Sequence, residues 1–246
     1  MAAPADALAL DEALLVVAAH DHPVDIPAQR YRLDELAARC EPGELGSIVE
    51  VLFADVGLRG DDDDYHHPDN SFLDRVLDRK RGLPILLSVL MAEVAARCGV
   101  CLAPVGMPGH FLLRDCAADG VFVDPFHGGR LLDEAGCEAI FRQLHPAEPF
   151  HPGYLEAVDS RSVLARVLTN LMRTYLQRGP VASLAWSAHL RAMVLGGDTW
   201  RLAARLRERT GEWQLAAEAW DQVARQGGDT SAAARVSSAA LRARVN

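Results

Sequence analysis

The sequence predicts an α+β domain followed by an all-α tail, and three observations lead to this fold class. Residues 85–98 are apolar on nearly every side of a helix, which is typical of a helix buried all round. The hydrophobic period then changes to that of short strands, so an antiparallel sheet is expected within residues 100–124. From residue 160 onward the chain is rich in alanine, leucine and arginine at helical spacing. A buried helix against a sheet makes the first part α+β.

The N-terminal 60 residues are expected to be helical and to precede a core at residues 70–135. Three segments carry apolar residues at helical spacing: 6–19, 33–40 and 44–55. Pro23 and Pro27 interrupt this pattern after the first segment, so the chain is expected to be irregular there.

A polar segment over residues 57–70 is expected to form a solvated loop. Its run Asp61–Asp64, followed by His66 and His67, resembles a set of metal ligands. Adjacent side chains of an extended loop point in different directions, however, and no second cluster completes a site, so no metal is expected. The basic residues of the segment 75–81 are expected to form a solvated helix face.

A short helix is predicted to lead from this loop into the central helix. Ser71 with Asp74 three residues later indicates a capping box at its start, and Gly82 is expected to end it. Pro84 suits the first turn of the central helix, because its missing N–H has no partner there. Gly99 is expected to stop that helix. The predicted strands span residues 100–105, 110–114 and 121–124.

The domain boundary is expected at Pro149, Pro152 and Gly153, which interrupt the chain between two periodic regions. This divides the chain into a first domain over residues 1–155 and a tail over residues 160–246.

Within the tail, Gly179 and Gly211 each follow one apolar helix and precede another. The two glycines lie 32 residues apart, which is close to the 34-residue tetratricopeptide unit. A tetratricopeptide-like helical tail is therefore expected.

The charge of the chain bears on its partners. It carries 25 basic and 34 acidic side chains, a net charge of -9. Such a chain repels phosphate backbones, so no nucleic-acid partner is expected. The longest apolar stretch, Leu83–Ala92, is far shorter than the roughly 20 residues that a membrane span needs. No membrane association is expected, and the N-terminus, with no lysine or arginine before Arg30, does not resemble a secretory signal.

The sequence contains five cysteines: Cys40, Cys98, Cys101, Cys116 and Cys137. An odd number without regular spacing argues against a disulfide framework and indicates a reducing compartment, so a cytoplasmic location is expected. Cys98 and Cys101 form a lone CxxC motif, which lacks the second pair that a structural zinc needs. No cofactor is expected.

His110 and Asp124 are the candidate functional residues of the strand region. They flank a turn near residues 117–120 almost symmetrically, and positions equidistant from a hairpin turn face each other. A carboxylate so placed can fix the imidazole tautomer and leave the other ring nitrogen as a base. Spacing alone leaves open whether the pair only ties two strands together. Pro108-Gly109 and Pro125 favour a site, because they hold the backbone on either side.

The segments NSFLDRVLDRKRGLPILLSVLMAEVAARCGV, VGMPGHFLLR and FVDPFHGG, in this order, closely resemble the SirB-type transglutaminase-like core family. The segments HDHPVDIPAQRYRLDELA and VLTNLMRTYLQRG fit the same pattern, so the resemblance covers most of the chain. It implies a transglutaminase-like (papain-like) domain. Bacterial members of the family carry tetratricopeptide-like tails, and the domain is also found beside F-box modules in eukaryotes.

The resemblance implies an ancestral cysteine–histidine–aspartate triad, in which His110 and Asp124 match the histidine and the aspartate. The cysteine of this superfamily opens the central helix, and its position falls on Pro84, which has neither a nucleophile nor an N–H. Proline at this position is typical of the SirB-type group. Ser88, one turn further along, is the alternative nucleophile, although a serine in an apolar helix more often bonds a carbonyl one turn back. Glu93 in the same helix is expected to pair with a buried arginine or backbone amides.

Three functions are compatible with these residues, in descending order of preference. The first is a non-catalytic, regulatory module that binds a protein or peptide in a pocket formed by His110 and Asp124 with Pro84, Asn70, Gly109 and Phe126. The second is an enzyme of altered chemistry, in which His110 acts as general base for amide or ester hydrolysis or acyl transfer. The third is a structural or metal-binding protein that uses the loop at residues 61–67. If the pocket lies at the surface, His110→Ala is expected to change stability little.

Overall fold

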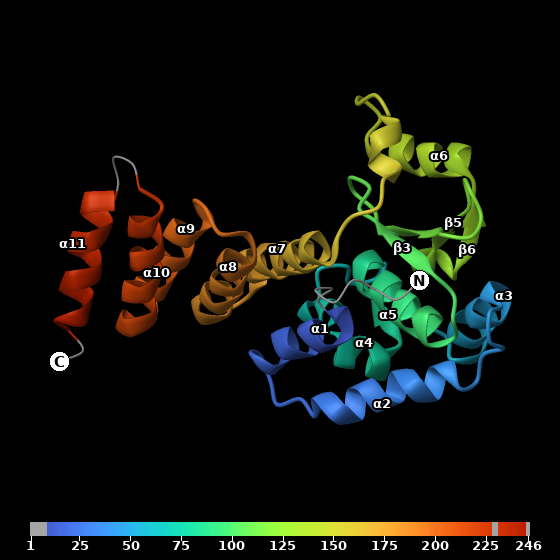
Figure 1. Ribbon diagram of the computed structural model, residues 1–246, viewed down its shortest axis with the longest axis horizontal. Coiled ribbons are helices and arrows are strands. Elements are labelled where there is room, and N and C mark those ends of the chain that lie inside the picture. The colour runs from blue at the N-terminus through green and yellow to red at the C-terminus, as the bar shows by residue number, and fades with distance from the viewer. Residues whose placement is uncertain (1–8, 228–230, 245–246) are drawn as a thin grey trace. The chain divides into compact units, whose positions relative to one another are not determined.

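The computed structural model of the protein describes residues 9–227 and 231–244. The chain divides into two compact units, Met1–Val163 and Leu164–Asn246. The first unit combines helices with an antiparallel sheet and the second is all-α, which confirms the predicted fold class (Figure 1). Within the described ranges, no helix is long and apolar enough to cross a membrane.

The N-terminal helices are α1 (Leu10–Ala19), α2 (Ile26–Ala37) and α3 (Leu45–Val49), which η1 (Glu50–Asp55) continues with wider π-type turns. Helix α2 begins earlier than predicted, because Pro27 opens the helix instead of interrupting it. Proline at this position loses no hydrogen bond, and the Asp25 carboxylate caps the helix by accepting a bond of 3.0 Å from the amide of Ala28. Residues 6–8 of the predicted first helix lie outside the described residues.

The predicted loop is more ordered than its composition suggests. Strand β1 (Arg59–Gly60) pairs in parallel with β2 (Arg81–Gly82), and between them lie η2 (Pro68–Ser71) and α4 (Leu73–Arg79). The predicted capping box is wrong, since the buried Ser71 hydroxyl has no hydrogen-bond partner and Asp74 bonds His22 instead. The predicted stop at Gly82 is also wrong. Helix α4 ends at Lys80, which takes the left-handed conformation (φ 59°) itself.

Helix α5 (Pro84–Arg97) is the predicted central helix, and most of its residues are buried. It contacts strands β3 (Leu102–Val105) and β4 (Leu112–Asp115). The antiparallel sheet continues with β5 (Phe122–Asp124) and with β6 (Arg130–Leu132), a strand that the sequence analysis missed, in the order β3-β4-β5-β6.

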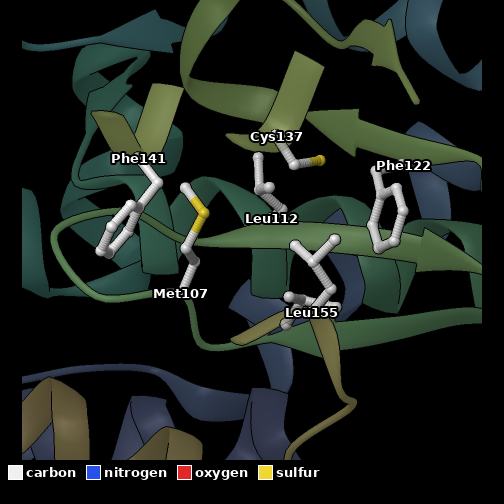
Figure 2. Packing of buried hydrophobic residues seen from close by; sticks show 7 residues of the cluster. Met107, Leu112, Phe122, Cys137, Phe141 and Leu155 are labelled. Atoms are coloured by element: carbon white, nitrogen blue, oxygen red, sulfur yellow. The ribbon is translucent and has the colours of Figure 1, made fainter. Parts of the chain in front are cut away.

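The opposite side of the sheet carries α6 (Glu134–Leu144), also missed, so that the sheet lies between α5 and α6 (Figure 1). Alternate strand residues serve the two sides. Figure 2 shows the cluster on the α6 side, where side chains from the sheet, from α6 and from η4 (Pro152–Leu155) meet. Its buried members are Val105, Met107, Leu112, Phe122, Cys137, Phe141 and Leu155.

Glu93 pairs with an arginine, as predicted from its position in an apolar helix. The Arg97 guanidinium donates to the Glu93 carboxylate at 3.0 Å, to Asp34 at 2.7 Å and to Asp11 at 2.6 Å. Asp11 is only 2% exposed and also accepts a bond from Arg30 at 3.1 Å. These ion pairs link α1 and α2 to the C-terminal turn of α5.

The second unit is built from α7 (Ser160–Arg178), which begins in the first unit, α8 (Val181–Leu195), α9 (Thr199–Arg209), α10 (Trp213–Arg225) and α11 (Ser231–Arg242). Small residues dominate its buried contacts, with Ala185 and Ala188 against Leu206, and Ala216 and Ala217 against Leu241. The first four helices match the predicted helix pairs closely, whereas α11 was not predicted. The tail is all-α, and its tetratricopeptide character stays a prediction.

Candidate functional site

The sheet brings His110 and Asp124 into direct contact. Leu113 of β4 faces Val123 of β5, and counting outward from this pair places Leu112 opposite Asp124. His110 therefore lies before β4, diagonal to Asp124, which is a position that a long side chain can bridge. Its Nε2 atom lies 2.9 Å from the Asp124 Oδ1 atom, which confirms the predicted contact between these two side chains.

Asp124 is the centre of the site, and its second oxygen binds a residue that the sequence analysis missed. The Nδ1 atom of His127 lies 2.7 Å from Asp124 Oδ2, and the guanidinium of Arg130 lies 3.5 Å from the same oxygen. Asp124 also caps the short helix η3 (Pro125–His127), accepting a bond of 3.3 Å from the backbone amide of His127. When an aspartate followed by proline begins a single helical turn, the residue three positions after the aspartate lies next to its carboxylate. This Asp-Pro signal could have identified His127.

The electrostatics keep the buried carboxylate ionised. Burial by itself would raise the pKa of Asp124, whose side chain is fully buried. Hydrogen bonds and charge from His110, and then from His127, outweigh burial and lower the pKa below its ordinary value. An ionised Asp124 can hold each imidazole in one orientation by accepting its N–H.

Three residues bear on whether a nucleophile stands beside the pair: Pro84, Ser88 and Cys137. Pro84 is buried in the first turn of α5 and offers no reactive atom. The hydroxyl of Ser88 is fully buried and lies 3.5 Å from the carbonyl oxygen of Phe111, to which it donates. Cys137 is near enough for the Asp124 charge to act on it, but burial, followed by that charge, raises the pKa of the thiol to about 12. A thiol so shifted stays protonated and unreactive.

Comparison with known proteins establishes the family. A profile of the transglutaminase-like superfamily matches residues 13–169, which is more than half of the chain. The chain belongs to the transglutaminase-like superfamily. The match covers the sheet, α5 and all the residues of the His110–Asp124–His127 group.

Curated relatives of this transglutaminase-like chain occur in bacteria and in mammals. A UPF0162 protein of Xylella fastidiosa is 37% identical over 146 residues, which are 54% of this chain and 50% of that protein. A UPF0162 protein of Pseudomonas aeruginosa is 32% identical over 186 residues, 72% of this chain and 68% of that protein. F-box only protein 21 of Homo sapiens is 32% identical over 137 residues, 52% of this chain and 21% of that protein.

The chain thus spans only half the length of its Xylella relative. The bacterial relatives are consistent with the expected SirB-type group. No solved structure matches the chain significantly.

Aromatic rings pack around the histidines of this transglutaminase-like site. Phe126 is 8% exposed and sets its ring edge-on to His110, with centroids 6.0 Å apart, and to Tyr65 at 6.2 Å. The ring can approach because residue 60 is glycine, where an added Cβ would lie 2.5 Å from a Phe126 carbon. The ordered loop of residues 57–70 therefore packs against the site through Tyr65.

Two of the predicted pocket residues have structural roles. Asn70 is fully buried, and its amide is committed within the protein, donating to the Asp64 carbonyl at 2.8 Å and accepting from Arg79 at 2.9 Å. Gly109 has a φ of 77°, and a Cβ there would lie 2.7 Å from the His145 Nε2 atom. Asn70 is therefore corrected from a pocket residue to a loop anchor, and Gly109 is required by its backbone conformation and its neighbour.

The acidic loop is not simply solvated, because Asp61 is 2% exposed and pairs with two of the arginines expected on a solvated helix face. Its carboxylate lies 3.2 Å from Arg79 and 3.5 Å from Arg81. These ion pairs explain why the loop is ordered, and they occupy the carboxylate that a metal would need.

A separate cavity of about 460 Å³ lies elsewhere in the first unit. Its walls come from α2, from the end of η1 and from the end of α4, and they include Arg32, Leu36, Asp55, Leu58 and Lys80. None of the predicted pocket residues contributes to it.

His110 is buried, and this overturns one expectation from the sequence. The side chain is 5% exposed, whereas the expectation that His110→Ala would be nearly neutral assumed a surface pocket. Removing the imidazole would take away the 2.9 Å partner of a buried Asp124 oxygen and leave it the 3.3 Å bond from the His127 amide, which costs about 1–3 kcal/mol. Loss of stability in that variant therefore does not distinguish a functional from a structural histidine.

The expected absence of disulfides is wrong for one pair of cysteines. Cys101 and Cys116 are bonded, with their Cα atoms 5.4 Å apart, because the register that pairs Leu102 with Asp115 also places them side by side. Cys40, Cys98 and Cys137 are free and buried. The two cysteines of the CxxC motif, Cys98 and Cys101, are therefore not bonded to each other. The cysteines no longer support the expected cytoplasmic location.

Proposed function

We propose that this transglutaminase-like protein is a non-catalytic, regulatory module that binds a protein or peptide at the His110–Asp124 site. The observation that supports the proposal is that the His110–Asp124 contact occurs together with a proline at the first position of α5. Pro84 opens α5 at the position that the family resemblance assigns to the cysteine. The Ser88 hydroxyl donates a hydrogen bond to the backbone carbonyl of Phe111. An imidazole and a carboxylate without a nucleophile can still bind polar groups of a ligand.

The occurrence of the domain in longer chains supports this proposal. In human F-box only protein 21 the matching stretch is 21% of the protein, so the related domain is one part of a larger chain. In the present protein the helices α7 to α11 follow the domain, and we propose that they form tetratricopeptide-like pairs that add a surface for the same partner.

A peptide selection tests the proposal. A phage-displayed library of random peptides is panned on the protein, and the affinity of the selected peptides is measured by calorimetry for wild type and His110→Gln. We expect micromolar peptides whose binding weakens about tenfold or more in the variant, in line with the loss of a central interface contact.

The matched control for this experiment is His22→Gln, which removes the histidine of another histidine–aspartate pair, formed with Asp74 and partly buried. Both variants are first checked by circular dichroism. Peptides that bind both variants as well as wild type, or a selection that yields none, would overturn the proposal.

An enzyme of altered chemistry is the second candidate, and the ionised Asp124 favours it. A carboxylate that holds His110 by one nitrogen could orient the imidazole as a general base for water, with Ser88 as a further candidate group. Hydrolysis of p-nitrophenyl acetate and of a peptide amide panel is compared between wild type and His110→Gln. We expect equal background rates, whereas turnover that disappears in the variant would establish this second function.

A further inference from the structure

Asp124 and the two histidines beside it bring together the donor atoms that a transition metal needs. His110, Asp124 and His127 each offer one donor atom, and these atoms lie within 4.8 Å of one another. We propose that these three residues bind a divalent transition-metal ion of the zinc type, with one coordination position open to solvent. The inference shares His110 and Asp124 with the proposed binding site, and it adds a ligand class that the sequence analysis did not assign there.

The chemistry of the set fits such an ion. Two imidazoles and one carboxylate are the protein ligands of several open zinc sites and of the facial triad of non-haem iron. Ligands at about 2.0–2.1 Å from a tetrahedral zinc lie about 3.3 Å from one another. The two histidine nitrogens lie 2.9 and 2.7 Å from the oxygens of Asp124. The ion would therefore replace the bridging protons after these two nitrogen–oxygen contacts lengthen by roughly half an ångström and the more distant donor atoms, all within 4.8 Å, draw together.

Two of the three residues are buried and the third is half-exposed, so an ion could reach the site from solvent. His110 is 5% exposed and Asp124 is fully buried, so two of the donors are held by the protein interior. The His127 side chain is 48% exposed, which provides both an entry path for the ion and an outward position for a fourth ligand. Phe126 packs edge-on to both histidines and supports their ring planes.

The turn that presents His127 is fixed by the backbone. Asp124 accepts from the backbone amide of His127 with its carboxylate and from the amide of Gly129, at 2.9 Å, with its carbonyl. Gly128 and Gly129 both have positive φ, and a Cβ at Gly129 would lie 2.7 Å from the Phe53 ring. The His127 backbone is therefore positioned before an ion arrives, which is what preorganised metal sites share.

Arg130 is a nearby cation that opposes the ion. Its guanidinium lies 3.5 Å from Asp124 Oδ2, and its side chain is 51% exposed, so it can turn into solvent when the ion binds. The other cluster considered from the sequence does not compete. Among the residues that the structure describes, no further group of three such donors converges, and Asp61 of the acidic loop is held by Arg79.

Calorimetric titration with zinc chloride tests the inference. The full chain is freed of metal by dialysis against a chelator, and binding is measured for wild type, His127→Ala and Arg130→Ala. We expect one zinc ion per chain in wild type, about 100-fold weaker binding in His127→Ala and several-fold tighter binding in Arg130→Ala, because a ligand or an opposing charge is removed. Cobalt(II) should give the visible absorption of a four- or five-coordinate site in wild type and in Arg130→Ala, but not in His127→Ala.

His151→Ala is the matched control, since it removes an exposed histidine outside the group and should leave zinc affinity unchanged. The half-exposed His127 can be removed without opening the core, so a failure to bind is not a failure to fold. Absence of stoichiometric zinc binding, or equal affinity in wild type and His127→Ala, would overturn the inference. Peptide binding measured in the presence of chelator decides the proposed function separately from the metal.

Discussion

His22 with Asp74 and His110 with Asp124, both in the first unit, are histidine–aspartate pairs that look alike at close range. His22 Nε2 lies 2.7 Å from Asp74, and His110 Nε2 lies 2.9 Å from Asp124. In each pair a phenylalanine ring meets the imidazole edge-on, Phe72 in the first and Phe126 in the second. Distance and ring packing therefore do not tell a structural tie from a candidate site.

The difference lies in what else each carboxylate binds. The Oδ1 atom of Asp74 is buried with no hydrogen-bond partner. The Oδ2 atom, which His22 contacts, lies 3.9 Å from the guanidinium of Arg75. Asp124 uses both oxygens, and its additional partner His127 reaches solvent. His22 with Asp74 joins the end of α1 to α4, whereas Asp124 is the centre of a network that opens to the surface. The comparison teaches that the candidate site differs from the structural pair by a further, solvent-exposed residue, His127, that binds the same carboxylate.

Replacing each of the two aspartates should give the largest difference in stability between the two pairs. Asp124→Ala leaves the buried His110 and the turn at His127 without their common acceptor and should lower the free energy of unfolding by about 4 kcal/mol, as breaking a buried ionic network does. Asp74→Ala removes one close partner and should cost about 2 kcal/mol. Urea denaturation of both variants measures the difference, and equal losses would show that the two networks are energetically equivalent.

Removing the histidines should give a smaller difference in the same direction. His110→Ala removes the closer partner of a fully buried oxygen and leaves it the longer bond from the His127 amide, which should cost about 2 kcal/mol. His22→Ala exposes Asp74 more readily and should cost about 1 kcal/mol. The same denaturation experiment measures both values. A larger loss in His22→Ala would reverse the comparison.

Lowering the pH should destabilise the fold through Asp124, and we expect a smaller loss of unfolding free energy than in the substitutions above. Because the folded-state pKa of Asp124 lies below its unfolded value of about 3.9, the carboxylate stabilises the fold at higher pH. This stabilisation is lost as the pH falls through the folded-state pKa. Unfolding free energies measured between pH 6 and pH 2 should therefore fall less steeply in Asp124→Asn than in wild type. Identical slopes would mean that Asp124 is not the titrating group.

Much of the fold follows from patterns within single elements. The apolar helix over residues 84–97 and the three strands after it are visible from hydrophobic period alone, and the glycines near residues 179 and 211 mark two helix pairs of the tail. The contact of His110 with Asp124 was predicted because a hairpin brings together residues that flank its turn.

The remainder depends on contacts that no single segment specifies. The Cys101–Cys116 bond follows from strand register, and the buried Asp61 pairs with Arg79 of α4 and Arg81 of β2. Pro27 was misjudged because a proline that opens a helix and one that breaks it look the same in sequence. His127 was missed because its role requires one short turn after an aspartate, a feature without periodicity.

One substitution tests most directly whether the site has lost only its nucleophile. Pro84→Cys should place a thiol at the start of α5, where the helix N-terminus and, as the family resemblance implies, His110 should lower its pKa. Alkylation of that thiol by iodoacetamide at pH 6, followed by peptide mass spectrometry in metal-free buffer, is compared with the same variant carrying His110→Gln. We predict alkylation about tenfold faster when His110 is present, and equal rates in the two proteins would contradict the account.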